Sequence, residues 1–183
     1  MAILKDRLRE ILAANRGCMA ALDCVKRLQL PQAVIGAGMI RTAVWDALTG
    51  RGPTPVEDID VLFFDPADTS RDTEQQIESR LSAMSPLPWS VRNQARMHMR
   101  NGDRPYASLE DALRFWLETP TCVAVRINAG TELEIVAPFG LEDLFAMRIR
   151  PTPRGRERAA DYRLRVETKG WAAQWPEAAI ELP

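Results

Sequence analysis

The sequence is poor in the residues that build metal clusters and disulfides. It has one histidine, His98, and three cysteines among 183 residues. A single histidine excludes a multi-histidine metal site. The cysteines Cys18, Cys24 and Cys122 are odd in number and show no C-x-x-C spacing. This pattern argues against a disulfide framework or a zinc knuckle and favours a reducing compartment.

Long apolar runs are also missing. No stretch reaches the roughly 18 residues needed to span a bilayer, and five charged side chains interrupt the first fifteen residues, unlike a signal peptide. The net charge of −1 favours neither a nucleic-acid binder nor an acidic tail. We therefore expect a cytoplasmic protein without a membrane partner. The sequence does not indicate its oligomeric state.

The composition, 46% hydrophobic and 27% charged, is typical of a globular protein with a real core. Apolar periodicity predicts strands interleaved with helices, and hence an α/β (α+β) fold with a small mixed sheet flanked by helices. Residues 89–101 fit a strand or a helix equally well. We expect one domain over residues 1–183, with a core at about 30–150 and helical segments at both ends. The expected helices are 2–14, 17–29, 39–50, 69–84, 108–118, 140–149 and 157–173. The expected strands are 32–38, which runs into a glycine turn, 58–64, 121–128 and 132–138.

Two aspartates stand in the strand-like segment "VEDIDVLFFD". A strand points residues i and i+2 to the same face, so Asp58 and Asp60 lie side by side. Two carboxylates about 4 Å apart repel by roughly 4 kcal/mol at an effective dielectric near 20. A divalent cation such as Mg²⁺ would relieve this repulsion. The alternative is that the two side chains lie on an exposed edge or cap a helix.

A glycine turn precedes the aspartates by about twenty residues. "VIGAGMIR" predicts a strand, a turn at Gly36 and Gly38, and the N-terminus of a helix, which presents backbone N–H groups to phosphate. Arg41, on the first helical turn, is placed for a bidentate phosphate contact. The pattern does not match G-x-G-x-x-G, because Arg41 stands where the third glycine would be, so a dinucleotide-binding fold is not expected.

A phosphate cradle followed by Asp-x-Asp resembles the polymerase-β-type nucleotidyltransferase superfamily. The segment "GMIRTAVWDALTGRGPTPVEDIDV" is similar to the head motif of tRNA-nucleotide-adding and poly(A)-polymerase enzymes, Gly-Gly-x-Val-Arg-Asp followed by a helix and Asp-x-Asp. From about residue 32 to 176 the chain resembles a bacterial family of nucleotidyltransferase-like proteins, on segments such as "DIDVLFFD", "WSVRNQARMHMRN" and "IVAPFGLEDLF". Thr42 departs from the motif, which has Asp or Asn there, so any contact made at Thr42 is in question.

The resemblance implies metal-dependent transfer of a nucleotidyl group from an NTP to an unknown acceptor, which could be a small molecule, a protein or an RNA. Mg²⁺ or Mn²⁺ would be held by Asp58, Asp60 and a third acid, for which Glu134 is favoured over Glu132. Gly36, Gly38, Arg41 and Thr42 would bind the nucleotide. Two alternatives stay open: an inactive nucleotide-binding or regulatory module, and a protein-interaction domain.

Further polar side chains fit a substrate cleft or ordinary surface structure. Amide and guanidinium groups in "NQARMH" suit a cleft, to which we assign Asn93, Gln94, Arg96 and His98. A lone histidine is more often a structural hydrogen-bonding residue. The eight basic residues between Arg148 and Lys169 could grip phosphates, or could form a solvated helix face.

Overall fold

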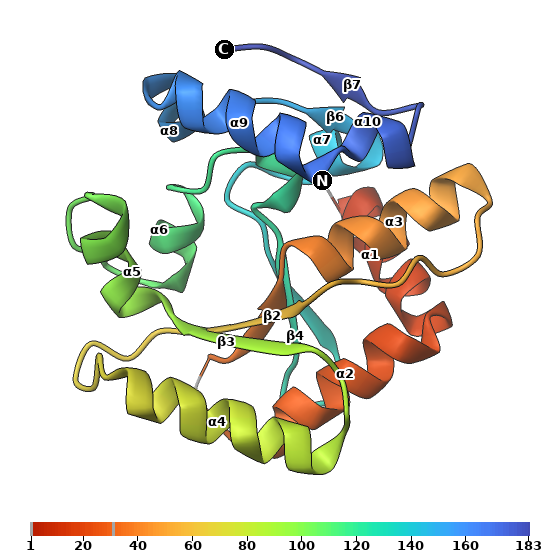
Figure 1. Cartoon of the computed structure of the whole chain (residues 1–183). Helices are drawn as coiled ribbons and strands as arrows, with labels where there is room; N and C mark the ends of the chain where they lie inside the picture. Colours follow the sequence, from red (N-terminus) through yellow and green to blue (C-terminus); the bar gives the residue numbers. More distant parts are fainter. Residues whose placement is uncertain (1, 31) are drawn as a thin grey trace.

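The computed structural model describes residues 2–30 and 32–183 of the chain. The elements are interleaved along the chain, as expected (Figure 1). The helices are α1 (Ala2–Ala14), α2 (Arg16–Arg27), α3 (Gly38–Thr49), α4 (Arg71–Met84), α5 (Gln94–Asn101), α6 (Leu109–Leu113), α7 (Glu142–Phe145), α8 (Pro153–Glu157), α9 (Ala159–Lys169) and α10 (Trp171–Gln174), with a 3₁₀ turn, η1 (Thr119–Thr121). The strands are β1 (Val34–Gly36), β2 (Ile59–Phe63), β3 (Trp89–Asn93), β4 (Ala124–Ile127), β5 (Leu133–Val136), β6 (Arg148–Ile149) and β7 (Ala179–Ile180).

The five-stranded sheet is mixed, in the order β3-β2-β1-β4-β5. Only β2 and β3 run parallel, and the other neighbours are antiparallel. The register pairs Ile35 of β1 with Val61 of β2, so β1 ends beside the place where β2 begins. The glycine turn after β1 and the aspartates at the start of β2 are therefore brought together by strand pairing, although about twenty residues separate them.

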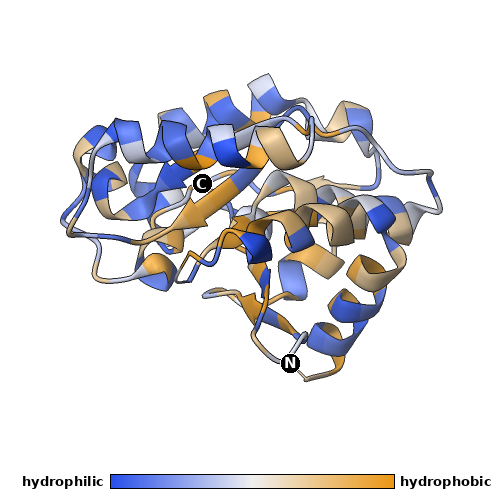
Figure 2. Ribbon diagram, turned by 90° about the horizontal axis from the view of Figure 1, so that it is seen from below, coloured by the Kyte–Doolittle hydropathy of each residue, from blue (hydrophilic) through white to orange (hydrophobic). Residues whose placement is uncertain are grey.

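The alternation of side chains along the strands divides the core into two parts. Ile35, Val61 and Val91 point to one face, where they join the larger apolar cluster with helices α1–α4. Leu62 points to the other face and packs with Leu113 of α6. Asp60 is two residues before Leu62 and shares that second face. Figure 2 shows the strands as mostly apolar, while the helices carry hydrophilic residues on their outer sides.

The C-terminal segment is folded onto the rest of the molecule. Helices α8, α9 and α10 lie across one end of the sheet, above α3 in the view of Figure 1. Tyr162 of α9 is fully buried, and its hydroxyl is within 3.0 Å of the Ile149 carbonyl oxygen and 2.8 Å of the Glu181 carbonyl oxygen. Trp175 packs edge-on against Trp45 of α3, with ring centroids 5.2 Å apart. These buried contacts fix α9 relative to the sheet.

Several elements differ from the sequence-based expectation. Residues 89–101 form both predicted structures in succession, β3 and then α5. The expected helix at 108–118 ends at Leu113. Beyond it, the carbonyl oxygens of Trp116 and Leu117 accept hydrogen bonds from the side chain and backbone of Thr152. The C-terminal segment thus holds this stretch in a non-helical path.

The remaining differences lie after residue 140. The helix expected at 140–149 is only the short α7, and β6, β7 and α8 had no clear sequence signal. The expected helix at 157–173 is divided by Gly170, whose left-handed backbone (φ 59°) caps α9. Among the described helices, none is both long and apolar enough to cross a membrane.

Candidate active site

The two aspartates lie beside the same cavity. Asp58 immediately precedes β2 and is exposed, while Asp60 is the second residue of β2 and is partly buried. Both line a cavity of about 640 Å³. Within the described part of the chain, neither carboxylate forms an ion pair with a basic side chain. The structure therefore brings the aspartates together as the spacing predicted, and leaves their negative charge facing the cavity.

The surroundings of Asp60 raise the pKa of its carboxyl group. Burial and the nearby charge of Asp58 raise the pKa of Asp60 from its ordinary value of 3.8 to about 6. Arg165, Arg92 and a hydrogen bond with Ser90 act in the opposite direction without cancelling the shift. A raised carboxylate pKa means that the negative charge is under-compensated. This is the electrostatic setting in which a cation would bind.

The glycine turn forms the adjoining wall of the cavity. Gly38 is the first residue of α3 and lines the cavity, and no described side chain caps this helix. The N–H groups of the first helical turn are therefore available for an anion. Gly36 does not line this cavity, and a Cβ there would lie 2.8 Å from Leu62 Cδ1. Its lack of a side chain allows the close packing of β1 against Leu62.

The turn residue between the two glycines is strained. Ala37 has φ 51° and ψ −117°, a conformation that favours glycine. Its N–H donates to the Val123 carbonyl oxygen at 3.0 Å, and its own carbonyl oxygen accepts from the Arg41 N–H at 3.1 Å. These two hydrogen bonds tie the turn to the segment before β4 and to α3. They hold Ala37 in place at the edge of the cavity.

Arg41 is a largely buried cation behind the glycine turn. Its guanidinium carbon lies 5.1 Å from the Trp171 ring centroid, 5.4 Å from that of Trp45 and 5.6 Å from that of Trp175. Burial lowers the pKa of Arg41 to about 10, so it stays charged at neutral pH. Its Nη2 donates to Thr42 Oγ1 at 3.2 Å, and both residues line the cavity. Arg41 thus contributes positive charge to the site while joining α3 to α10.

Neither glutamate considered as a third acid is brought to the aspartates. Glu134 lies on the edge strand β5, and β1 and β4 stand between β5 and β2. Its carboxylate accepts two hydrogen bonds, at 2.9 and 2.8 Å, from the Arg126 guanidinium on the neighbouring strand. Glu132 is exposed in the turn before β5. Among the residues that the structure describes, no group of three or more His, Cys, Asp or Glu side chains could hold a metal ion.

Of the four residues assigned to the substrate cleft, only Gln94 lines a cavity that contains Asp60. Gln94 borders a second cavity, of about 420 Å³, that also contains Asp60. Asn93 is fully buried, and its side chain binds backbone groups of Asp65, Asp68 and Ala95. Asn93 therefore fixes the loop after β2.

Arg96 and His98 have local partners as well. Arg96 forms an ion pair with the buried Glu74 of α4. The Nδ1 atom of His98 lies 2.8 Å from the Ala95 carbonyl oxygen, and its ring packs edge-on against Tyr106. Both residues stabilise the surroundings of α5 and do not line either of the two cavities that contain Asp60.

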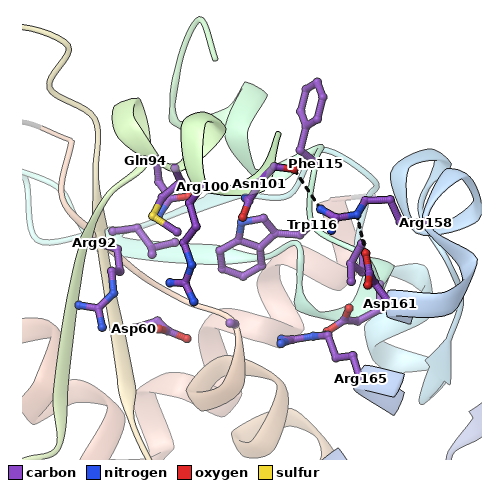
Figure 3. A pocket seen from close by; sticks show the side chains of 15 residues that line it. Asp60, Arg92, Gln94, Arg100, Asn101, Phe115, Trp116, Arg158, Asp161 and Arg165 are labelled. Atoms are coloured by element: carbon purple, nitrogen blue, oxygen red, sulfur yellow. Dashed lines mark hydrogen bonds and ion pairs between the residues drawn. The ribbon is translucent and has the colours of Figure 1, made fainter. Parts of the chain in front are cut away.

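Helix α9 and the residue before it supply further cleft residues. The sequence analysis placed the two arginines in a basic run without assigning them to the cleft, and did not name the aspartate. Arg158, Asp161 and Arg165 line the second cavity, and Arg165 also lines the first. In Figure 3 they face Asp60, Arg92 and Arg100 across the cavity, with Trp116 between the two groups. Arg158 donates to Asp161 at 2.6 Å and to the Asn101 carbonyl oxygen at 3.1 Å. Their three- and four-residue spacing was a usable signal, because it places them on one face of a helix.

The two cavities share Asp60, and together they form the candidate active-site cleft. The first offers carboxylates, a helix N-terminus and basic side chains, groups that suit a metal-bound polyphosphate. The second combines the aromatic rings of Phe115 and Trp116 with amide and guanidinium groups, which suits a planar polar ligand. Such an arrangement can bind two reacting groups on either side of Asp60.

Comparison with known proteins gives independent evidence on the family and the fold. The model of a family described as nucleotidyltransferase matches residues 23–180. A protein whose NMR structure reveals a CCA-adding enzyme head domain is 30% identical, with a TM-score of 0.86, and the match covers 97% of this chain and 96% of that one. No curated protein matches the chain.

Two longer enzymes share the fold at lower identity. A CCA-adding enzyme in complex with CTP is 15% identical, with a TM-score of 0.60, and the match covers 94% of this chain and 42% of that one. A tRNA-processing enzyme in an apo form is 19% identical, with a TM-score of 0.56 and coverages of 88% and 44%. This chain therefore spans less than half of either enzyme. From the family match and the head-domain similarity together, the chain belongs to the nucleotidyltransferase family.

Proposed function

We propose that this protein transfers a nucleotidyl group from an NTP to an acceptor hydroxyl, with Mg²⁺ or Mn²⁺ bound at Asp58 and Asp60. The observation that carries the proposal is the pair of aspartates without ion-pair partners, facing the same cavity as the uncapped N-terminus of α3. Nucleotidyl transfer is the chemistry of the family to which the chain belongs.

The residues present fit a divalent ion. Mg²⁺ is usually held by one or two protein carboxylates together with substrate phosphates and water. Asp58 and Asp60 supply two carboxylates, and the raised pKa of Asp60 reflects a site where added positive charge is favourable. When bound, the ion would neutralise triphosphate charge and lower the pKa of the attacking hydroxyl.

The chain's own residues bind and orient the substrates. The first-turn N–H groups of α3 would donate to the triphosphate from one wall of the cavity, with Arg41 behind them as a fixed positive charge. The acceptor hydroxyl releases its proton to water as its oxygen forms a bond with the α-phosphorus, and the bond from the α-phosphorus to the bridging oxygen breaks, so that the electron pair leaves with pyrophosphate. Pyrophosphate leaves on the side opposite the attack. Asp60 lies where the two cavities meet, which suits a position close to the α-phosphate.

A nucleotide-binding module that performs no transfer is the second candidate. It is favoured by one observation, the lack of a third metal-ligating carboxylate beside the aspartates in the described part of the chain. A protein-interaction domain has less support, because it does not account for two carboxylates that line the same cavity.

Pyrophosphate release separates transfer from binding alone. The native protein would be incubated with Mg²⁺ and each of the four NTPs, with water, a 3′-hydroxyl RNA, or an extract of small metabolites as acceptor. We expect pyrophosphate release with at least one combination, and its loss in Asp60→Asn. NTP binding without release from any combination would favour the second candidate and contradict the transfer reaction.

A further inference from the structure

Helix α9 presents a polar face to the active-site cleft and an apolar face to the core. Arg158, immediately before the helix, together with Asp161 and Arg165 follows the three- and four-residue spacing of one helical face, and all three line the cleft. Tyr162 lies beside them on the adjoining face of the helix, where it is buried and its hydroxyl is held by backbone carbonyl groups of both β6 and the chain after β7. The helix is thus fixed in place, and the position of its polar face is determined by the core.

Arg165 is the residue of this face that lies at the centre of the cleft. It lines both cavities on either side of Asp60. Its Nε donates to Glu118 Oε1 at 2.6 Å, while 41% of its side chain remains exposed. One edge of the guanidinium is therefore fixed, and its two Nη groups have no partner among the described residues. In Figure 3 the Arg165 side chain extends into the cavity toward Asp60.

Glu118 is an unusual partner because it is a buried carboxylate. Its side chain is 1% exposed, and Oε2 has no hydrogen-bond partner within residues 2–30 and 32–183. A buried carboxylate is costly unless it is paired with a cation. Its carbonyl oxygen accepts from the side chains of Thr121 and Cys122, which fixes the backbone at this position. A rigid, buried anion is well suited to hold a guanidinium in one orientation.

From these contacts we infer that Arg165 binds the phosphates of the NTP, and that Glu118 is the positioning residue that aims its guanidinium into the cleft. The inference rests on the proposed function and adds a phosphate ligand from the C-terminal segment. Guanidinium groups bind phosphate through two parallel N–H donors. With Nε bonded to Glu118, the two Nη groups of Arg165 are oriented for this contact. The phosphates would then lie between the N-terminus of α3 and helix α9.

The first test measures NTP affinity after replacing Arg165. Calorimetric titration with each of the four NTPs and Mg²⁺ would compare the native protein with Arg165→Gln and Arg165→Lys. Loss of a charge-assisted bidentate contact is expected to raise the Kd about 10- to 100-fold in Arg165→Gln. Lysine restores only part of the affinity, because one ammonium cannot serve Glu118 and phosphate together. Arg163→Gln is the matched control, since Arg163 is an exposed arginine on α9 that lines neither cavity.

The second test distinguishes positioning from a structural role of Glu118. Glu118→Gln keeps the shape and an acceptor oxygen but removes the charge that orients Arg165. We expect it to raise the Kd about 3- to 10-fold in the native background and to have no further effect in Arg165→Gln, because the two residues act through one contact. A merely structural role would lower the Tm of both backgrounds equally and leave the Kd unchanged.

The outcomes separate this inference from the proposed function. Native affinity in Arg165→Gln, together with lost affinity in Asp58→Asn, would overturn the role of Arg165 and leave the proposed function intact. Independent, additive effects of Glu118→Gln and Arg165→Gln on the Kd would overturn the positioning role of Glu118. If the native protein bound none of the four NTPs, both the proposed function and this inference would be wrong.

Discussion

Single substitutions at Gly36, Ala37 and Gly38 are expected to change the unfolding free energy of the protein in three different ways. Ala37 adopts φ 51° and ψ −117°. A non-glycine residue held there costs about 1–3 kcal/mol. Ala37→Gly removes that strain, and the greater freedom of glycine in the unfolded chain offsets about 0.4–1 kcal/mol of the gain. We expect a net stabilisation of about 0.5–2 kcal/mol.

Gly36→Ala is expected to act in the opposite direction. The new methyl would lie 2.8 Å from Leu62 Cδ1, with the Trp116 ring 3.7 Å away. Leu62 is only 1% exposed and has little room to move, so overpacking should cost about 1–3 kcal/mol. A Cβ at Gly38 would meet no atom within 4 Å. Gly38→Ala should therefore change stability by less than about 0.5 kcal/mol, and should weaken NTP binding because it narrows the cavity.

Urea denaturation at 25 °C measures all three changes, and thermal unfolding gives a second reading. For a chain of this size, 1 kcal/mol corresponds to about 2–4 °C in Tm. The expected order of stability is Ala37→Gly above native, native close to Gly38→Ala, and Gly36→Ala lowest. Ala37→Gly would refute the reasoning if it lowered the unfolding free energy by about 1 kcal/mol, as an ordinary alanine-to-glycine change does.

Three further results are expected from single substitutions, and one from a change of pH. Asp58→Asn should lower the pKa of Asp60 from about 6 while leaving it above 3.8, because burial is the larger cause of the shift; an NMR titration of the metal-free protein that gave an unchanged pKa would contradict this. In the same metal-free native protein, the contribution of Asp60 to the unfolding free energy should fall as pH rises from about 4 to 6, since the folded state binds the Asp60 proton more tightly than the unfolded state does. Glu134→Gln should leave Mg²⁺-dependent NTP affinity unchanged and cost at most about 1 kcal/mol, because it breaks only the half-exposed pair with Arg126; a large loss of affinity would place Glu134 in the site after all. Asn93→Ala should destabilise the protein by about 2–4 kcal/mol in urea, since four hydrogen bonds are lost in a buried position, and a change below about 1 kcal/mol would contradict the structural role of Asn93.

Local patterns in the sequence were sufficient to predict the strand–turn–helix and the paired aspartates near β1 and β2, which line one cavity of the candidate site. The i, i+2 spacing of Asp58 and Asp60, and the strand–turn–helix pattern at Gly38, depend only on backbone periodicity. The N-terminal caps of α4 and α6 are local features of the same kind, because Ser70 and Ser108 each accept a hydrogen bond from the backbone of their own helix. The mixed α/β fold followed from the alternation of the two periodicities and from the resemblance of the head motif.

The other half of the site depends on contacts between distant segments. Glu134 was favoured as the third acid, and it stands between the apolar residues Leu133 and Ile135. Sheet order decides which strand adjoins β2, however, and periodicity carries no information on that order. Gly36 was interpreted as a phosphate-binding glycine, and periodicity did not predict the close approach of Leu62 on the next strand. Arg165 lay within a basic run that fitted a solvated face equally well. Its role depends on Glu118, 47 residues earlier in the chain.

The most direct test of the central claim is calorimetric titration of the native protein and Asp58→Asn with each of the four NTPs, with Mg²⁺ and with EDTA. Asp58 is exposed and outside the apolar core, so the substitution should leave the fold intact, which the Tm would verify. The account predicts Mg²⁺-dependent binding of at least one NTP to the native protein, and loss of that binding in Asp58→Asn. Equal binding by both proteins would contradict the assignment of the metal site, and no binding of any NTP would contradict the proposed function itself.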